Sequence, residues 1–449
     1  MVTALRPKPG PARSYQFPKF HDQVLPGGIR LVVAPVGKLP VVTVLVVVDA
    51  GSANDPSGKE GVAMLTARAL LEGNRRYNGV ELAEKSEQLG TSLESGADWD
   101  SAFVKITVLS DRLAEAIQLL GEVVTTPVFP EREIERLKSE RLAEILQIET
   151  EPRALADERF ESFLYAEASR YSKPDGGTTA SVTKLARVDV EQFFRLRFVS
   201  EGMTVVVTGD IRPQLARDLV ESAFVGSTAG SVRKQPLVVA ARSRDRNVHV
   251  VSKTEAPQSE LRVGHIGLPR SHPDFFPTMV MNAVLGGLFG SRINLNLREA
   301  HGYTYGASSY YDWRRGPGPF VVATAVESDV TALALREIFL EIDRIRSEEV
   351  SAEELSLATQ YLEGVFPIRY ETTSAVATAL ANLVIHDLPH DYYDSYRRNI
   401  RGVTAKSVLE AGRTHIHPAE LQTVVVGDAA LIRQPLAELG AGGVEIHDA

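Results

Sequence analysis

The chain has 449 residues, no cysteine and a net charge of −9 at pH 7. The length predicts two or more domains, and the lack of cysteine excludes disulfides, thiolate nucleophiles and cysteine-bound metal. Without a basic face or a long apolar run, nucleic acid is not an expected partner and no membrane span is expected. Because the N-terminal sequence lacks the apolar core of a signal peptide, we expect a cytoplasmic protein, or a periplasmic one if a signal peptide has been trimmed.

Two stretches of the chain share one order of predicted elements. The first has a β-branched strand at 41–48, a strand at 91–97, a helical run from about 129 to 147 and a strand at 205–210. The second has the same elements at 261–268, 303–310, 350–364 and 423–428. Helices are expected between the strands, the 205–210 and 423–428 strands are expected to close their halves, and Ser351 with Glu354 has the spacing of a capping box.

This repeat predicts a mixed α+β architecture with two tandem homologous domains. The segment between Gly226 and Arg244 contains Gly, Ser and Pro and has little periodicity, which is typical of a linker. We therefore expect an N-terminal domain at 1–228, a linker at 229–239 and a C-terminal domain at 240–449.

One predicted helix of the first half places Met64, Ala67 and Arg68 on a single face. The sequence GVAMLTARALLEG, after VVVDAGSANDPSGKEG, resembles peptidase family M16, the pitrilysin, insulinase and processing-peptidase-like proteins, and the similarity runs over nearly the whole chain. The resemblance implies the LuxS-like metallohydrolase fold and half of a clamshell. In active members this helix carries H-x-x-E-H, in which two His bind zinc and Glu is the general base.

The residues found at these positions cannot build that zinc site. Met64 is a poor ligand for Zn²⁺, Ala67 has no proton acceptor, and Arg68 brings a permanent cation to the place of the metal. Glu144 matches the family's third ligand and is the one part retained. The sequence therefore predicts no zinc at this degenerate site and no cofactor in this chain, with an ion pair between Arg68 and Glu144 in place of the metal. An ordinary amphipathic helix with Met64 as core filler is the plainer interpretation.

A second segment, Leu297-Arg298-Glu299-Ala300-His301-Gly302-Tyr303-Thr304-Tyr305-Gly306, resembles the C-terminal signature of the family. The signature has an Arg at a helix end and a Tyr seven residues later in the following strand, which Arg298 and Tyr305 fit, with Gly302 at the helix exit. The resemblance implies that this pair hydrogen-bonds the substrate near the scissile carbonyl. A guanidinium and a phenol are donors that can meet the negative charge of a tetrahedral intermediate.

Structural roles are the alternative for both side chains. Arg298 could pair with Glu299 or Asp312, and Tyr305 could pack in a strand with the neighbouring tyrosines 303, 310 and 311. The glycines at 286–290 match neither a P-loop nor a dinucleotide-binding motif, so phosphate binding is not expected.

The histidines give little support for another metal site. His386 and His390 are four residues apart, but Pro389 interrupts the helix between them, and His415 and His417 precede a proline. For these two pairs a surface or capping role is the default expectation. The remaining histidines are isolated in the sequence: His21, His249, His265, His272, His301 and His447.

The resemblance implies a division of labour. In two-chain members of the family one subunit carries the zinc helix and the other carries the Arg/Tyr pair, and this chain has the second pattern. We expect a subunit that is inactive alone and supplies Arg298 and Tyr305 in trans to a homologous partner with an intact HxxEH motif and Zn²⁺, acting on peptides or unfolded polypeptides. The alternatives are an inert structural or docking protein, like the core proteins of respiratory complexes, and a glycine-loop receptor for targeting peptides.

Overall fold

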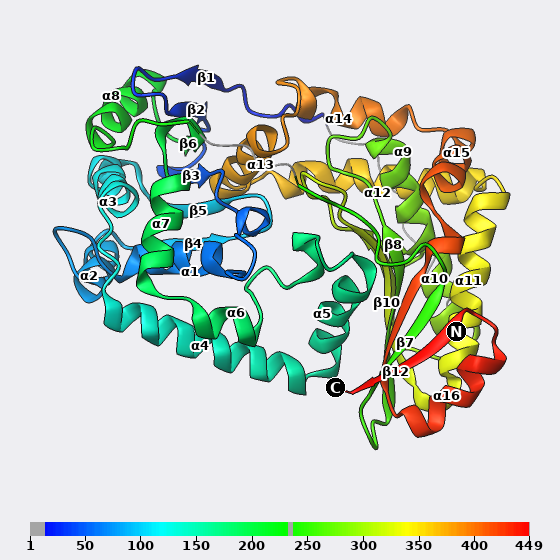
Figure 1. Ribbon diagram of the computed structural model, residues 1–449. Coiled ribbons are helices and arrows are strands. Elements are labelled where there is room, and N and C mark those ends of the chain that lie inside the picture. Colours follow the sequence, from blue (N-terminus) through cyan, green and yellow to red (C-terminus); the bar gives the residue numbers. More distant parts are fainter. Residues whose placement is uncertain (1–13, 232–236, 449) are drawn as a thin grey trace, which may run out of the picture.

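The computed structural model describes residues 14–231 and 237–448. In this part of the chain each half contains one six-stranded sheet with helices packed against it (Figure 1). The prediction of two tandem α+β units is therefore confirmed. Part of the predicted linker, residues 232–236, and the N-terminal residues 1–13, on which the expectation of no signal peptide rests, lie outside the described residues, so the domain boundaries stay a prediction.

The first sheet has the strand order β1-β2-β6-β3-β5-β4. Its central strand β3 is apolar at seven of its eight positions, VVTVLVVV, because both faces of the sheet are covered. Val44 and Val46 point into the core of the first half, whereas Leu45 and Val47 point into a core shared with the second half. The strands are β1 His21–Val24, β2 Arg30–Pro35, β3 Val41–Val48, β4 Glu94–Ala97, β5 Ala102–Leu109 and β6 Met203–Gly209.

The second sheet repeats this arrangement as β12-β7-β11-β8-β10-β9. Strands β7, β11, β8, β10 and β9 take the places of β2, β6, β3, β5 and β4. The strands are β7 Asn247–Ser252, β8 Gln258–Ile266, β9 Ala307–Tyr311, β10 Pro319–Glu327, β11 Gln422–Gly427 and β12 Gly443–Asp448.

The prediction of strands was wrong at the ends of each half. The halves do not begin at 41 and 261, because β1, β2 and β7 precede those strands, and the second half does not end with β11, because β12 follows it. These four strands are short or carry polar residues, and their pairing is set by strands far away in the chain. Local periodicity therefore carried little signal for them.

The helices of the first half surround the first sheet and also extend beyond it (Figure 1). Each of the two long predicted helical runs is found, as α4 in the first half and α12 in the second. The first-half helices are α1 Val62–Ala69, α2 Gly79–Gln88, α3 Leu113–Thr125, α4 Glu131–Thr150, α5 Pro152–Leu164, α6 Thr179–Lys184, α7 Arg187–Arg197 and α8 Pro213–Ala223.

The helices of the second half include the predicted capping box. Ser351 Oγ accepts from the backbone amide of Glu354, and the Glu354 carboxylate accepts from the backbone amide of Ser351 at 2.8 Å. The helices are α9 Phe275–Asn282, α10 Arg292–Asn294, α11 Thr331–Ser347, α12 Ala352–Arg369, α13 Thr373–Ile385, α14 Tyr392–Arg401, α15 Ala405–His415 and α16 Ala429–Glu438, with π-helical turns at Ala283–Gly287 and Leu295–Ala300.

The two halves exchange one helix each. Helix α5 of the first half packs on β8 and β11 of the second sheet, and α13 of the second half packs on β3 and β6 of the first (Figure 1). Phe160 of α5 lies in one apolar cluster with Val424 and Val426 of β11. This exchange buries apolar surface of both halves and fixes them to one another.

Candidate functional site

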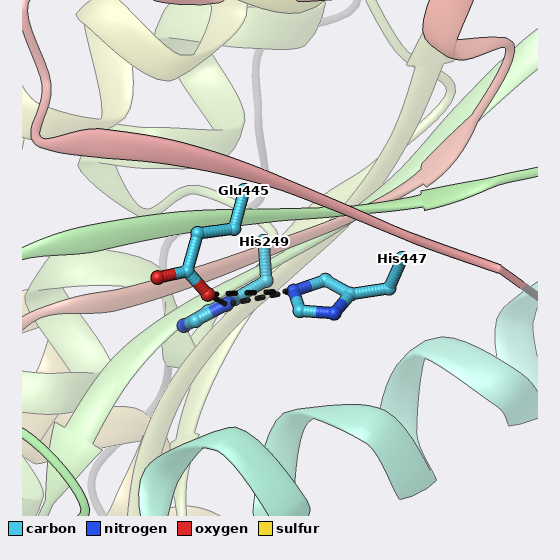
Figure 2. Close-up of side chains that lie close together, drawn as sticks. All are labelled: His249, Glu445 and His447. Atoms are coloured by element: carbon cyan, nitrogen blue, oxygen red, sulfur yellow. Dashed lines mark hydrogen bonds and ion pairs between the residues drawn. The ribbon is translucent and has the colours of Figure 1, made fainter.

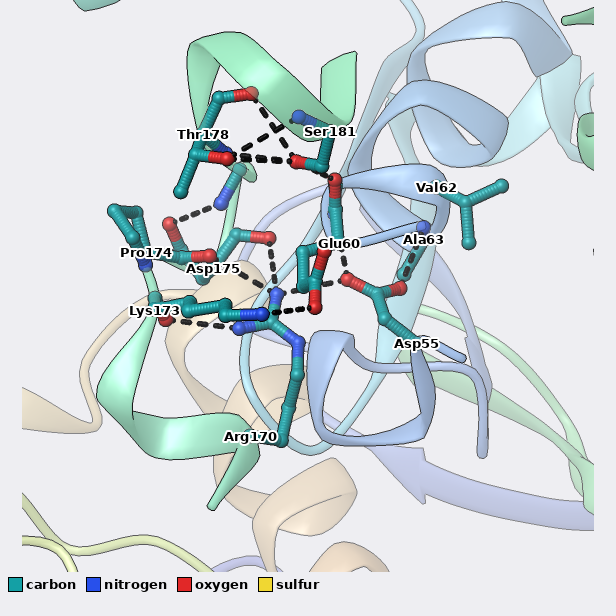
Figure 3. Close-up of polar contacts among 12 residues, drawn as sticks. Asp55, Glu60, Val62, Ala63, Arg170, Lys173, Pro174, Asp175, Thr178 and Ser181 are labelled. Atoms are coloured by element: carbon teal, nitrogen blue, oxygen red, sulfur yellow. Dashed lines mark hydrogen bonds and ion pairs between the residues drawn. The ribbon is translucent and has the colours of Figure 1, made fainter. Parts of the chain in front are cut away.

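A buried polar network determines where α1 begins (Figure 3). The carboxylate of Asp55 accepts from the backbone amides of Gly61 at 2.7 Å and Ala63 at 2.9 Å, which satisfies two of the free N–H groups at the helix start. Arg170 donates to the same carboxylate at 2.8 Å. Burial raises the pKa of Asp55 to about 6, although Arg170 and the two amides act in the opposite direction.

A second layer of this network ties α1 to the loop before α6. Lys173 forms an ion pair with Glu60 at 2.8 Å, and the Ser181 hydroxyl donates to the backbone carbonyl of Glu60 at 2.9 Å (Figure 3). The residues just before α1 are thus held by contacts from Asp55, Lys173 and Ser181. The helix that bears the zinc ligands in active family members keeps a rigid support here even though its ligands are absent.

Arg68 and Glu144 lie together, as the sequence predicted. Arg68 on α1 donates two hydrogen bonds to the Glu144 carboxylate on α4, at 2.8 and 3.1 Å. Arg141 adds a third at 3.1 Å and also donates to the Gly176 carbonyl at 3.0 Å. The hydrogen bond from Arg68, followed by the one from Arg141, lowers the pKa of Glu144, so the carboxylate stays ionised.

This cluster cannot act as the family's catalytic metal centre. Met64 and Arg68 are part-buried side chains on one side of α1, while Ala67 is fully buried and packs in the first-half core. Both guanidinium groups occupy the acceptor sites of Glu144, and no carboxylate stands at position 67 to accept a proton. The loss of Arg68 would not leave the Glu144 carboxylate without a cation, because Arg141 also contacts it.

Arg298 lies in the π-helical turn Leu295–Ala300. Gly302 follows the turn with φ +66, the left-handed conformation that favours glycine at this position, so the predicted helix exit is confirmed. The Arg298 guanidinium lies 4.5 Å from the centroid of the Phe289 ring, and its Nε lies 3.6 Å from the Glu299 carboxylate. Asp312, the other proposed partner, pairs with Arg314 instead.

Tyr305 differs from its predicted placement. It was expected within a strand, but β9 begins at Ala307, and the Tyr305 side chain is 94% exposed. The aromatic packing proposed as its structural role is therefore wrong. The strand starts later because Thr304 turns the chain, accepting from the Gly306 amide at 3.1 Å, and Asn294 accepts from the Ala307 amide at 3.0 Å.

The backbone around Tyr305 is thus held while its side chain is free. Thr324 on β10 contacts the Thr304 hydroxyl at 3.0 Å and donates to the Gly306 carbonyl at 3.1 Å. Tyr305 and Phe289 line one groove of about 600 Å³ over β8, β10 and β9. Since Arg298 stacks on Phe289, the predicted pair lies on one continuous surface, although no contact between Arg298 and Tyr305 is seen within the described residues.

The glycine-rich segment before Arg298 serves close packing. A Cβ at Gly286 would lie 2.5 Å from the Ser309 Oγ and 2.6 Å from the Ser309 amide nitrogen on β9. Asn282 then joins the two elements by donating to the Ser309 carbonyl at 3.0 Å and accepting from its hydroxyl at 2.7 Å. This packing explains the glycine without a phosphate ligand.

Sequence reasoning missed two groups of metal-ligand residues. His249 and His447, expected to be isolated, lie together beside Glu445 (Figure 2), and His272, also expected to be isolated, lies near Asp274 and His415. His386 and His390 do not belong to either group. Residues brought together by strand pairing across nearly two hundred positions leave no local spacing signal, so only the fold reveals them.

Comparison with known proteins places this architecture in a family. The chain belongs to peptidase family M16: residues 32–173 match the family described as insulinase (peptidase family M16), and residues 184–362 match the peptidase M16 inactive domain. The match to the inactive domain and the similarity to a non-peptidase homolog support an M16 subunit of the inactive type.

The relatives include a protein named as a non-peptidase homolog and a protein named as a zinc protease. A non-peptidase homolog, YmxG, of Helicobacter pylori is 24% identical over 84% of this chain and 87% of its own length. An uncharacterized zinc protease of Streptomyces coelicolor is 22% identical over 78% of this chain and 77% of its own. The crystal structure of a peptidase M16 inactive domain from Pseudomonas fluorescens has a TM-score of 0.86 at 22% identity, covering 91% of this chain and 98% of that one. A protease from Helicobacter pylori has a TM-score of 0.85 at 18% identity. These solved structures support the M16 fold.

Proposed function

We propose that this chain is the subunit of a two-chain M16 peptidase that lacks the catalytic zinc, and that it supplies Arg298 and Tyr305 to substrate held at a partner's zinc. One observation carries the proposal. Arg68 and Glu144, which the resemblance assigns to the place of the family's metal, form an ion pair, while Tyr305 is presented to solvent from an anchored loop. A phenol that is 94% exposed beside well-paired backbone contributes little to the fold, which favours a role in binding.

The chemistry of the two side chains fits the proposal. Hydrolysis of a peptide bond places negative charge on the carbonyl oxygen in the transition state, and fixed hydrogen-bond donors stabilise that charge. A guanidinium donates without ever losing its proton, and a phenol donates below its pKa near 10. Among residues 14–231 and 237–448, Arg298 has one charge contact, with exposed Glu299 at 3.6 Å, so its N–H groups are available to a substrate.

The groove beside this pair suits an extended polypeptide. It runs across β8, β10 and β9 with Phe289 and Tyr305 at its wall, and Phe289 is 73% exposed. An apolar ring next to hydrogen-bond donors offers a place for a side chain beside contacts for the main chain. In the proposed assembly the second half of this chain faces the first half of the partner, and the chamber between them admits peptides or unfolded chains.

No helix of the described residues is long and apolar enough to cross a membrane.

Reconstitution tests the proposal. The chain is mixed with an M16 subunit that has an intact HxxEH motif, and cleavage of a fluorogenic peptide is followed for each chain alone and for the mixture. We expect neither chain to be active alone and the mixture to be active and sensitive to chelator. Chelator-sensitive cleavage by this chain alone would contradict the proposal, and a mixture no more active than the partner would support an inert docking role.

A further inference from the structure

Three side chains with metal-ligand chemistry converge at the edge of the second sheet (Figure 2). Strand β12 pairs in parallel with β7, and Glu445 lies opposite His249 in this register. His447 is two residues further along β12, so it points to the same face as Glu445. The cluster thus joins the last strand of the described chain to its neighbour.

The distances fit one tetrahedral metal ion. His249 Nδ1 lies 3.2 Å from His447 Nε2 and 3.4 Å from Glu445 Oε2, and the last two atoms are 3.7 Å apart. A zinc ion with bonds of about 2.0–2.1 Å in tetrahedral geometry separates its ligand atoms by about 3.3–3.4 Å. The three atoms therefore already lie near the corners of one face of such a tetrahedron.

The hydrogen bonds around His249 place its proton on Nε2 and leave Nδ1 as an acceptor. The Gln422 amide nitrogen donates to the backbone carbonyls of Asp245 at 2.9 Å and Glu420 at 3.2 Å, so the Gln422 Oε1 faces His249. That oxygen lies 3.3 Å from His249 Nε2, which must then carry the proton. A partner that fixes the far nitrogen is the usual support of a metal-binding His.

The converging atoms have too few protons to satisfy one another. His249 Nδ1 and Glu445 Oε2 are both acceptors, and His447 Nε2 can donate only one hydrogen bond between them. A cation among the three atoms satisfies all of them at once.

The surroundings hold both rings in place. Phe163 of α5 stacks on His249 with ring centroids 4.1 Å apart and an interplanar angle of 3°. Its ring centroid also lies 4.5 Å from that of His447. His249 is buried, whereas the Glu445 side chain is 60% exposed, so a fourth position is open to water. The cluster therefore spans β7, β12 and the helix that the first half contributes.

We propose that His249, Glu445 and His447 bind one Zn²⁺ or similar transition-metal ion that fastens β12 to the sheet. Two imidazoles and one carboxylate form a ligand set that zinc accepts. This site is separate from the degenerate family site near Arg68, and it does not depend on the proposed function. Strand β12 is an edge strand with one paired neighbour, β7, and a metal that bridges the two strands opposes their separation.

The group of His272, Asp274 and His415 is the weaker candidate. His415 Nε2 already pairs with the Asp274 carboxylate at 2.8 Å, and His272 Nδ1 accepts from the Asp274 backbone amide at 3.1 Å. These atoms already have partners, so no cation is needed to satisfy them.

Metal retention tests the site. The full chain is stripped with chelator, incubated with ZnCl₂, passed through a desalting column and analysed for zinc by plasma emission. We expect about one zinc per chain in the wild type and a loss in His447→Ala and Glu445→Gln, whose side chains are part-exposed and tolerate replacement. Gln422→Ala, which removes the support of His249, should weaken zinc binding by about 10–100-fold.

A control variant and a hydrogen-exchange measurement distinguish zinc bound at this site from zinc bound elsewhere on the protein. His21→Ala, an exposed His on the edge strand β1 of the other sheet, should retain zinc like the wild type. Zinc should also slow hydrogen exchange in residues 443–448 of the wild type and not of His447→Ala. Folded wild-type protein that retains no more zinc than His447→Ala, or zinc that has no effect on exchange in β12, would overturn the proposal.

Discussion

The ion pair between Arg292 and Glu354 offers a quantitative test of how the Arg298 segment is held. Arg292 on α10 donates two hydrogen bonds to Glu354 on α12, at 2.6 and 3.0 Å, and its side chain is only 5% exposed. Glu354→Gln removes the charge but keeps a side chain that can still accept in the capping box. The substitution therefore isolates the ion pair from the helix cap.

The expected loss follows from the shifted titration of Glu354. The hydrogen bond from Arg292 is the main cause that lowers the pKa of Glu354 from 4.5 to about 2. A shift of this size corresponds to about 3 kcal/mol at neutral pH. Because the Glu354 side chain is 30% exposed, solvent screening reduces this to about 2 kcal/mol. We expect Glu354→Gln to lower the free energy of unfolding by that amount.

The pH dependence has a definite sign. A carboxyl group with a lowered folded pKa stabilises the protein above its unfolded value, and this contribution is lost as the pH falls from about 4.5 towards 2. The difference between wild type and Glu354→Gln should therefore be full at about pH 7 and shrink below about pH 4.5. Urea unfolding followed by circular dichroism measures it.

Glu353→Gln is the matched control, since Glu353 is an exposed neighbour in the same helical turn. It should change the unfolding free energy by less than about 0.5 kcal/mol. Equal stability of the two variants at neutral pH, or a difference that grows in acid, would refute the reasoning.

Three further outcomes are expected. Arg68→Ala should cost only about 0.2–1 kcal/mol in urea unfolding, because the pair is partly exposed and Arg141 remains on the carboxylate; a loss above about 2 kcal/mol would refute this. Gly286→Ala should lower the free energy of unfolding by about 1–3 kcal/mol, and with it the melting temperature, because the added Cβ overlaps Ser309. Gly290→Ala should not, because the nearest atom to its added Cβ is 3.5 Å away. Equal melting temperatures of the two variants would contradict the packing at Gly286. The reconstituted assembly should cleave short peptides and spare folded proteins in a gel assay, and efficient cleavage of a native globular protein would contradict a closed chamber.

Features encoded by local pattern could be predicted from the sequence. The run Val41–Val48 is β3 with the predicted bounds, because a continuous apolar segment suits a strand buried on both faces. The capping box at Ser351 and Glu354 depends only on residues three apart. The contact of Arg68 with Glu144 could also be predicted, because the family resemblance implied that both side chains point to the place of one metal.

Features that arise from pairing between distant parts of the chain could not be predicted from the sequence. The exchange of α5 and α13 depends on which sheet each helix covers, and helix amphipathicity does not carry that information. Tyr305 lies before its strand because contacts with Asn294 and Thr324 delay the pairing. The metal-ligand group at His249 exists only because β12 returns to pair with β7.

The role of Tyr305 in trans is tested most directly by the turnover number of the reconstituted heterodimer. If its phenol meets the charge on the carbonyl oxygen, Tyr305→Phe should lower kcat by roughly 10²–10³ while assembly and the partner's zinc content stay unchanged. Arg298→Ala should behave alike, and Tyr361→Phe, an exposed tyrosine on α12, should turn over like the wild type. A Tyr305→Phe heterodimer that assembles normally and cleaves peptide at the wild-type rate would contradict the central claim.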